Sequence, residues 1–223
     1  MSFDSIVSAI LSISSKESQG HRDRILLLDE EANKIKSGEH SLDDFSSFLR
    51  SIHDPFICGE TALRALILRL IRLSIKDLSY CNIIVEEEVH WLVLMSLERE
   101  HEYMLERMQA LKLMRVFIAL CPLSFPIAFA RSLVAVANNK DDNIRRVCLE
   151  SLRELSVIVP ELVVRVNGIS CLLDAVIEPN TQDMAEPILM SILYLLNDSE
   201  TRQAKCIVFF LLFFFILLFC YHF

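Results

Sequence analysis

The chain has 223 residues, of which 53% are hydrophobic and 23% charged, so it can bury a large core and is not a disordered segment. It contains only 4 Gly and 6 Pro, which argues against an all-β sandwich, a Rossmann-type glycine fingerprint and a P-loop. The formal net charge is -8, and an acidic chain is a poor binder of nucleic acid because phosphate contacts need a basic surface. We therefore expect no nucleic-acid partner.

Residues 1–24 are predicted to form a flexible N-terminal leader. They are Ser-rich, become polar towards the end (SSKESQGHRDR), and contain one short predicted helix around residues 6–13. The start lacks the basic region of a secretory signal, and Asp4 comes early. We therefore expect a cytoplasmic protein.

Residues 25–52 are predicted to form two helices, with a break at Ser37-Gly38. In the second helix, an apolar stripe at helical spacing consists of Leu42, Phe45, Leu49 and Ile52. Ser41 and Asp44 resemble a capping pair at its start, where an acidic residue is favourable.

Residues 53–202 read as a run of amphipathic helices separated by short polar joints. The joints carry Pro, Asn and Gly, which end helices or accept the turn after them. No segment alternates with period two for long. We therefore predict an all-α domain over residues 25–202.

Four apolar pairs that open helical stripes suggest internal repeats. They are Ala62-Leu63, Ala110-Leu111, Cys148-Leu149 and Ile188-Leu189, separated by 48, 38 and 40 residues. HEAT and armadillo repeats have periods of about 40–47 residues, and each of their helical hairpins is covered by the next. We predict an armadillo/HEAT-like α-solenoid of stacked helical hairpins; the alternative is an ordinary helical bundle with accidental spacing.

Residues 203–223 form a Phe-rich hydrophobic C-terminal tail. Residues 206–221 contain no charge, and as a helix they would span about 24 Å, at the lower edge of the length needed to cross a bilayer. The tail is interpreted as a membrane anchor, as a non-native end of the product, or as a buried capping helix. The candidate membrane segment includes Cys206, Phe209, Phe213, Phe214, Phe215, Phe219 and Tyr221.

The seven cysteines are widely spaced and form no CxxC pair, so they are interpreted as small buried apolar residues rather than disulfides. Trp91 lies in the apolar run VHWLVLM and is predicted to be a core anchor; the alternative is an interface anchor.

Catalytic and metal-binding patterns are not found. The six histidines are scattered, and the segment EREHE at residues 98–102 is better explained as a solvated helix surface than as a metal site. No GxSxG elbow or kinase element occurs. We therefore predict a protein that is not an enzyme and has no cofactor, metal or small-molecule substrate.

A cluster of charges at residues 141–146 is the one candidate for a partner-binding edge. It consists of Asp141, Asp142, Arg145 and Arg146. We interpret these charges first as a helix start in which the acidic residues interact favourably with the helix dipole, and the partner-binding edge is the alternative.

Residues 107–179 resemble the N-terminal region of the Rictor family, the rapamycin-insensitive companion of TOR. The resemblance continues through residues 188–202 and begins near residue 24. Its most specific segments are ERMQALKLMR, SLVAVANNKDDNIRRVCLESL and LLNDSETR. The joints match as well as the apolar stripes.

The resemblance implies a non-enzymatic scaffold of TOR complex 2. In that family an N-terminal armadillo/HEAT-like cluster packs against the TOR kinase and helps to hold Sin1, and the complex often acts at membranes. Family members are usually far longer, and the tail after Arg202 does not resemble them, which indicates a truncated or alternative product. The alternative is a membrane-tethered helical adaptor anchored by residues 206–221.

Overall fold

The computed structural model describes residues 3–14, 21–32 and 41–197. The regular secondary structure of these residues is helical throughout, so the all-α prediction is confirmed. The chain divides into two compact units, here called unit 1 (residues 1–121) and unit 2 (residues 122–223).

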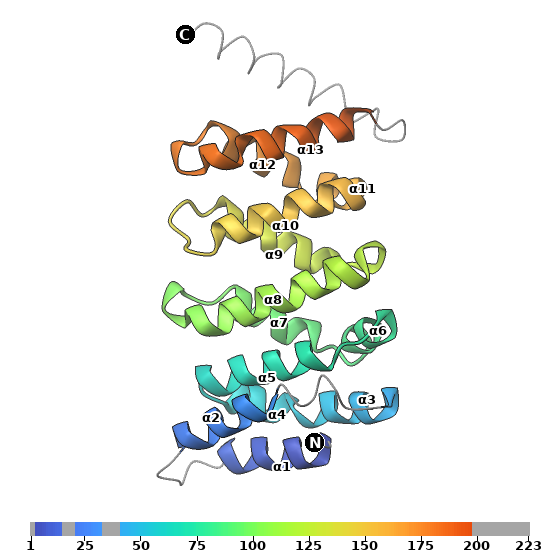
Figure 1. The fold of residues 1–223 in the computed structure, drawn as a ribbon, viewed down its shortest axis with the longest axis vertical. Helices are drawn as coiled ribbons and strands as arrows, with labels where there is room; N and C mark the ends of the chain where they lie inside the picture. Colours follow the sequence, from blue (N-terminus) through green and yellow to red (C-terminus); the bar gives the residue numbers. More distant parts are fainter. Residues whose placement is uncertain (1–2, 15–20, 33–40, 198–223) are drawn as a thin grey trace, which may run out of the picture. The chain divides into compact units, whose positions relative to one another are not determined.

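Unit 1 is built from paired helices (Figure 1). Its elements are α1 (Phe3–Ser14), α2 (His21–Ala32), α3 (Leu42–Ser51), α4 (His53–Cys58), α5 (Thr61–Ser74), α6 (Leu78–Glu86), α7 (His90–Leu97), the 3₁₀ turn η2 (His101–Tyr103) and α8 (Met104–Leu120). The long helices α5 and α8 pack side by side, α7 covers α8, and α2 lies against α5. The core of the unit lies between these layers.

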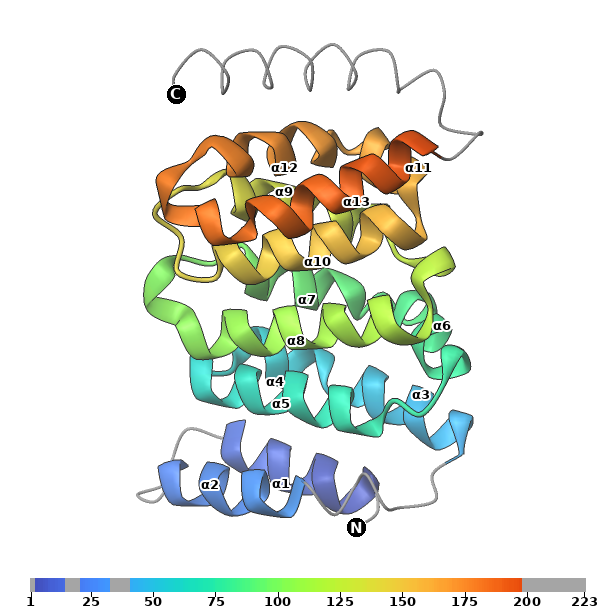
Figure 2. The ribbon, with the colours of Figure 1, turned by 45° about the horizontal axis from the view of Figure 1, so that its top comes forward.

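Unit 2 follows the same scheme (Figure 2). Its elements are η3 (Pro122–Ser124), α9 (Ile127–Asn138), α10 (Arg145–Ile158), α11 (Pro160–Arg165), α12 (Gly168–Ile177), the 3₁₀ turn η4 (Pro179–Met184) and α13 (Ala185–Asn197). Here α10 packs on α9, and α13 packs on both α10 and α12.

The predicted repeats correspond to real layers of the fold. The four apolar pairs fall in α5, α8, α10 and α13, the second helices of successive hairpins. Within unit 1, α5 stacks on α8, and within unit 2, α10 stacks on α13. Stacked hairpins in each unit confirm the armadillo/HEAT-like solenoid architecture.

The N-terminal segment is more structured than we expected. The helix predicted around residues 6–13 is α1, and Phe3, Ile6, Ile10 and Ile13 form a helical stripe that is buried. The Phe3 ring stacks on Phe48 of α3 with 4.7 Å between centroids. The prediction of a flexible leader is therefore wrong for residues 3–14, because their apolar stripe joins the core of unit 1. The boundaries at residues 24 and 202 stay predictions.

The helix start predicted at Ser41 is confirmed in detail. Ser41 Oγ accepts a hydrogen bond from the Asp44 amide (3.1 Å), and Asp44 Oδ2 accepts one from the Ser41 amide (3.2 Å). This reciprocal capping box satisfies two amides that the helix leaves without a partner. Phe45, Leu49 and Ile52 of the predicted stripe are buried, whereas Leu42 is exposed.

Trp91 is not the core anchor that we predicted. Its side chain is 53% exposed, and Met95, one turn later on α7, is 48% exposed. Helix α7 has only 8 residues and is apolar nearly all round, while only the side that carries Val93 and Leu97 is fully buried. The apolar residues therefore surround more of α7 than the neighbouring helices cover.

The cysteine prediction holds for most of the described residues. Cys81, Cys121, Cys148 and Cys171 are buried and Cys58 is exposed, all as free thiols. Burial raises the pKa of the Cys171 thiol to about 11, so this residue behaves as a small apolar group. Cys206 and Cys220 lie outside the described residues.

None of the helices that the structure describes is long and apolar enough to cross a bilayer. The candidate membrane segment at residues 206–221 lies outside the described residues. The membrane-anchor interpretation therefore stays a prediction.

Candidate functional site

The structure brings the four predicted edge residues together at one end of unit 2. They lie in the joint between α9 and α10 and in the first turn of α10. Lys140, Glu178 and Asp183 contribute further charges to the same place. We call these seven residues the charged edge.

Asp142 is a structural part of the charged edge. Its side chain is only 7% exposed, and Oδ1 accepts a hydrogen bond from the Ile144 amide at 3.0 Å. Its carbonyl accepts another from the amide of Arg145, also at 3.0 Å. An acidic side chain that accepts the amide two residues later forms an Asx turn, and near a helix start it interacts favourably with the helix dipole. Asp142 therefore shapes the turn that leads into α10.

Arg145 is also turned inward. It is 6% exposed, and Nε donates to the Ala137 carbonyl at the end of α9 at 2.7 Å. Its Nη2 forms an ion pair with Glu178 Oε2 at 2.7 Å, and Lys140 Nζ lies 3.1 Å from Glu178 Oε1. Burial opposes ionisation of Glu178, but the hydrogen bonds from Lys140 and Arg145 outweigh it and lower the pKa of this carboxyl. Arg145 thus joins α10 to the ends of α9 and α12.

Asp141 and Arg146 are the exposed members of the predicted four. Arg146 is half-exposed and pairs with Asp183 of η4 and, at 3.7 Å, with Glu150 one turn along α10. Asp141 is exposed, and its amide donates to Asn139 Oδ1 at 3.3 Å. These two residues and the exposed Lys140 remain accessible to a partner. The other two hold the edge in shape.

The helical phase of the two arginines already distinguishes them in the sequence, although we did not predict the difference. Arg145 is in phase with the buried residues Cys148, Leu149 and Leu152, whereas Arg146 is not. An arginine in phase with the core at a helix start faces inward.

The inward arginine recurs at the start of three second helices. In each hairpin, a buried arginine in the first turn donates to a carbonyl at the end of the preceding helix. The pairs are Arg64 with Gly59, Arg107 with Leu97 and Arg145 with Ala137. A cation at a helix C-terminus satisfies a free carbonyl and interacts favourably with the dipole. Sequence reasoning missed this feature, although the arginines are spaced by 43 and 38 residues, close to the repeat period.

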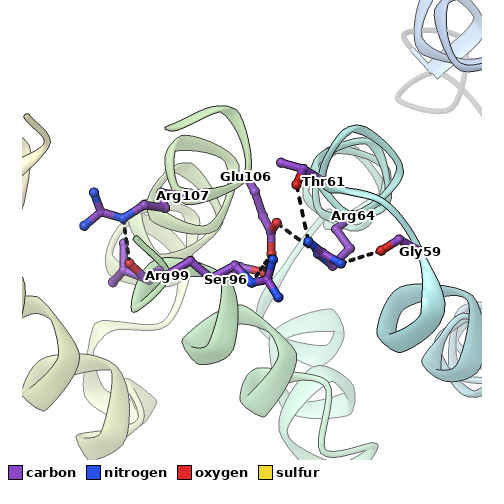
Figure 3. Close-up of polar contacts among 8 residues, drawn as sticks. Gly59, Thr61, Arg64, Ser96, Arg99, Glu106 and Arg107 are labelled. Atoms are coloured by element: carbon purple, nitrogen blue, oxygen red, sulfur yellow. Dashed lines mark hydrogen bonds and ion pairs between the residues drawn. The ribbon is translucent and has the colours of Figure 1, made fainter. Parts of the chain in front are cut away.

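In unit 1, Arg64 belongs to a buried ionic network (Figure 3). Glu106 of α8 is 1% exposed and accepts from Arg64 Nε of α5 at 2.9 Å and from Ser96 Oγ of α7 at 2.8 Å. Arg99 lies 3.6 Å from the same carboxylate. A carboxylate that is buried among several protein donors is not accessible to a substrate, so it is not placed to act as a general base. The network links three helices and has a structural role.

The region that suggested a metal site does not assemble one. Glu98, Glu100, His101 and Glu102 are all exposed. Within the described ranges, no group of three or more His, Cys, Asp or Glu residues is placed to hold a metal ion. The charged edge and the exposed helix surfaces remain as candidates for function.

Comparison with known proteins gives a consistent result. The family model described as "Rapamycin-insensitive companion of mTOR, N-term" matches residues 28–212. Protein pianissimo A of Dictyostelium discoideum is 36% identical over 149 residues, which cover 66% of this chain and 13% of that protein. The rapamycin-insensitive companion of mTOR of Homo sapiens is 32% identical over 160 residues, covering 67% of this chain and 9% of that protein. The TOR complex 2 subunit TSC11 of Saccharomyces cerevisiae is 26% identical over 158 residues, covering 71% of this chain and 11% of that protein.

Two details of these matches matter. The chain corresponds to only 13% and 9% of the length of the first two relatives. The family model extends to residue 212, so it contradicts our expectation that the resemblance ends at Arg202.

Proposed function

The chain belongs to the Rictor family, and from this premise we propose that it works as a non-enzymatic scaffold of TOR complex 2. The observation that carries the proposal is the match of the family's N-terminal model over residues 28–212. Relatives from two yeasts are named as target of rapamycin complex 2 subunits. The proposed partners are the TOR kinase and a Sin1-like subunit.

The architecture supports a binding role. Stacked hairpins present helix surfaces and joints in rows, and such surfaces suit extended protein contacts. In unit 2 the charged edge is kept in a fixed shape by Asp142 and Arg145, which places Asp141 and Arg146 on a rigid support. Side chains held on a rigid support lose little entropy on binding. We therefore propose that Asp141 and Arg146 contact the partner, with Asp142 and Arg145 acting through the shape of the joint.

The direct test is co-expression of the full chain with the TOR kinase and the Sin1-like subunit of the same organism, followed by affinity purification. We expect at least one of the two to be retained. If a chain with a helical circular dichroism spectrum retains neither, the proposal is wrong.

The edge is tested by reversing its exposed charges. The double variant Asp141→Lys/Arg146→Glu leaves the net charge unchanged. We expect it to weaken partner binding about tenfold without loss of helicity. A tenfold change corresponds to about 1.4 kcal/mol of binding free energy. The matched control exchanges Arg131 of α9 and Glu161 of α11, both exposed and outside the edge, for the opposite charges. Equal loss in both variants, or loss of helicity in the edge variant, would contradict a role in contact.

A further inference from the structure

A groove in unit 1 lies between α2, α5 and α8 and has a volume of about 630 Å³. Along α5 its lining changes from Ala62 and Leu66 to Arg69 and Arg72. Along α8 it changes in the same order, from Leu105 to Lys112. The two helices run in the same direction (Figures 1 and 2), so the groove has an apolar end and a cationic end.

Two polar atoms in the groove lack a hydrogen-bond partner among the described residues. They are Nε of Arg72, a donor, and Oε1 of Gln109, an acceptor, and both atoms are buried. The Gln109 side chain as a whole is 9% exposed. A buried polar group without a partner costs free energy, and natural proteins keep few of them. Polar groups that the fold leaves unsatisfied therefore lie beside the groove.

The charge of the groove is positive in a chain whose net charge is -8. Asp29 of α2 pairs with Arg69, so one of the three cations is already neutralised. Burial lowers the pKa of Arg72, and repulsion from Arg69 adds to this effect. An incoming anion would relieve this repulsion at Arg72 and would also meet the exposed Lys112.

Two of the apolar side chains that line the groove are exposed to solvent. Leu26 of α2 is 60% exposed and Leu105 of α8 is 57% exposed, and both line the groove. Exposed apolar side chains that flank a groove with polar groups are typical of a protein-binding site.

We propose that this groove binds an acidic peptide segment of a protein partner. An apolar side chain of the segment packs against Leu26 and Leu105, and a carboxylate next to it pairs with Arg72 and Lys112. A phosphate ion would also pair with Arg72 and Lys112, but it has nothing to fill the apolar end, so the peptide is the better match. Such binding does not require membership of TOR complex 2.

The test is selection of a random peptide library on the immobilised full chain. Enriched peptides are then synthesised with a fluorophore and their affinities are measured by anisotropy. We expect the enriched sequences to carry a carboxylate beside a large apolar residue. We expect Arg72→Met and Lys112→Glu each to weaken binding about tenfold or more, and the control Arg131→Glu to change it less than twofold.

Three results would overturn the proposal. They are no enrichment above the bare support, enriched peptides without acidic residues, and affinities that are equal in the groove variants and the wild type.

Lys112→Glu separates binding from folding, because Lys112 is exposed. We expect an unchanged Tm together with the weaker peptide binding. A lower Tm with unchanged binding would overturn the role of Lys112 as a peptide contact.

Discussion

Units 1 and 2 use the same inward arginine, but they surround it differently. In unit 1 Arg64 meets Glu106, a carboxylate that is 1% exposed and is shared with Ser96. In unit 2 Arg145 meets Glu178, whose side chain is 14% exposed and also pairs with the exposed Lys140. A buried ion pair is costly to break on one side, whereas a partly hydrated carboxylate can regain water. One repeat element can therefore serve as a core network in one unit and as support for an exposed edge in the other.

The largest expected effect is in the buried network. Glu106→Gln leaves Arg64 buried without its counter-charge, so we expect the free energy of unfolding of unit 1 to fall by about 3–5 kcal/mol. Denaturant unfolding followed by circular dichroism measures the loss, and Glu98→Gln, on an exposed carboxylate nearby, is the control. The double variant Arg64→Met/Glu106→Met removes both charges and should be more stable than Glu106→Gln alone. If the double variant is less stable than Glu106→Gln, the network stabilises the fold by more than the mutual neutralisation of its two charges.

The second effect compares the arginines of the two units directly. Arg107→Met removes a side chain that is 2% exposed and frees the Leu97 carbonyl, and we expect a loss of about 3 kcal/mol. Arg145→Met frees the Ala137 carbonyl, but Glu178 keeps Lys140 and water, so we expect about 2 kcal/mol.

Hydrogen exchange followed by mass spectrometry reports the local stability of the two units separately. Faster exchange should appear in peptides of α7 and α8 for the first variant and of α9 and α10 for the second. Equal losses in both variants would show that the Lys140 contact left at Glu178 does not reduce the cost of removing Arg145.

The third effect concerns two closely packed glycines of the described residues, one in each unit. A Cβ on Gly59 would lie 2.5 Å from the Pro55 carbonyl oxygen, a backbone atom. A Cβ on Gly168 would lie 2.6 Å from Val163 Cγ1, a side-chain atom that a rotamer change can move. We therefore expect Gly59→Ala to lower stability by about 2–3 kcal/mol and Gly168→Ala by about 1–2 kcal/mol. Thermal unfolding shows which variant loses more stability. A larger loss for Gly168→Ala would show that the α4 backbone moves away from the added Cβ more easily than the Val163 side chain does.

The sequence predicted the layers of this fold much better than it predicted the surfaces. The apolar pairs in α5, α8, α10 and α13 mark real second helices, because helical spacing and repeat period are local properties of the chain. Trp91 was misplaced because an all-apolar helix does not reveal which side packing will cover. The charges around Arg145 and Arg146 do lie together, but two of the four predicted members, Asp142 and Arg145, are turned inward.

The groove of unit 1 could not be predicted in the same way. Its lining comes from α2, α5 and α8, which are brought together only by tertiary packing. A missing partner for Arg72 or Gln109 is likewise a property of the packed unit and not of the sequence. The inward arginines, in contrast, follow helical phase, because Arg64, Arg107 and Arg145 each precede buried residues at spacings of three and four.

The smallest expected effect compares exposed ionic contacts through their pH dependence. In unit 1, Glu87 accepts two hydrogen bonds from Arg50 (2.6 and 2.8 Å) and one from Ser46 (2.6 Å), and these lower the pKa of Glu87 from 4.5 to about 2. A carboxyl with a lowered folded-state pKa stabilises the fold above its unfolded pKa, and the contribution is lost as the pH falls from 4.5 through about 2. Because Arg50 is 70% exposed, solvent screens the contact, and we expect only about 1 kcal/mol at pH 7.

Glu87→Gln should therefore be about 1 kcal/mol less stable than the wild type at neutral pH, and the difference should shrink as the pH falls from 4.5 towards 2. In unit 2, Glu178→Gln should also lose its effect in acid, since the pKa of Glu178 is lowered too, but its neutral-pH loss should be larger because Arg145 is buried. Stability measured by denaturant unfolding between pH 2 and pH 7 tests both variants. A difference for Glu87→Gln that stays constant with pH would mean that Ser46 and packing hold the contact between α3 and the end of α6, and that its charge does not contribute.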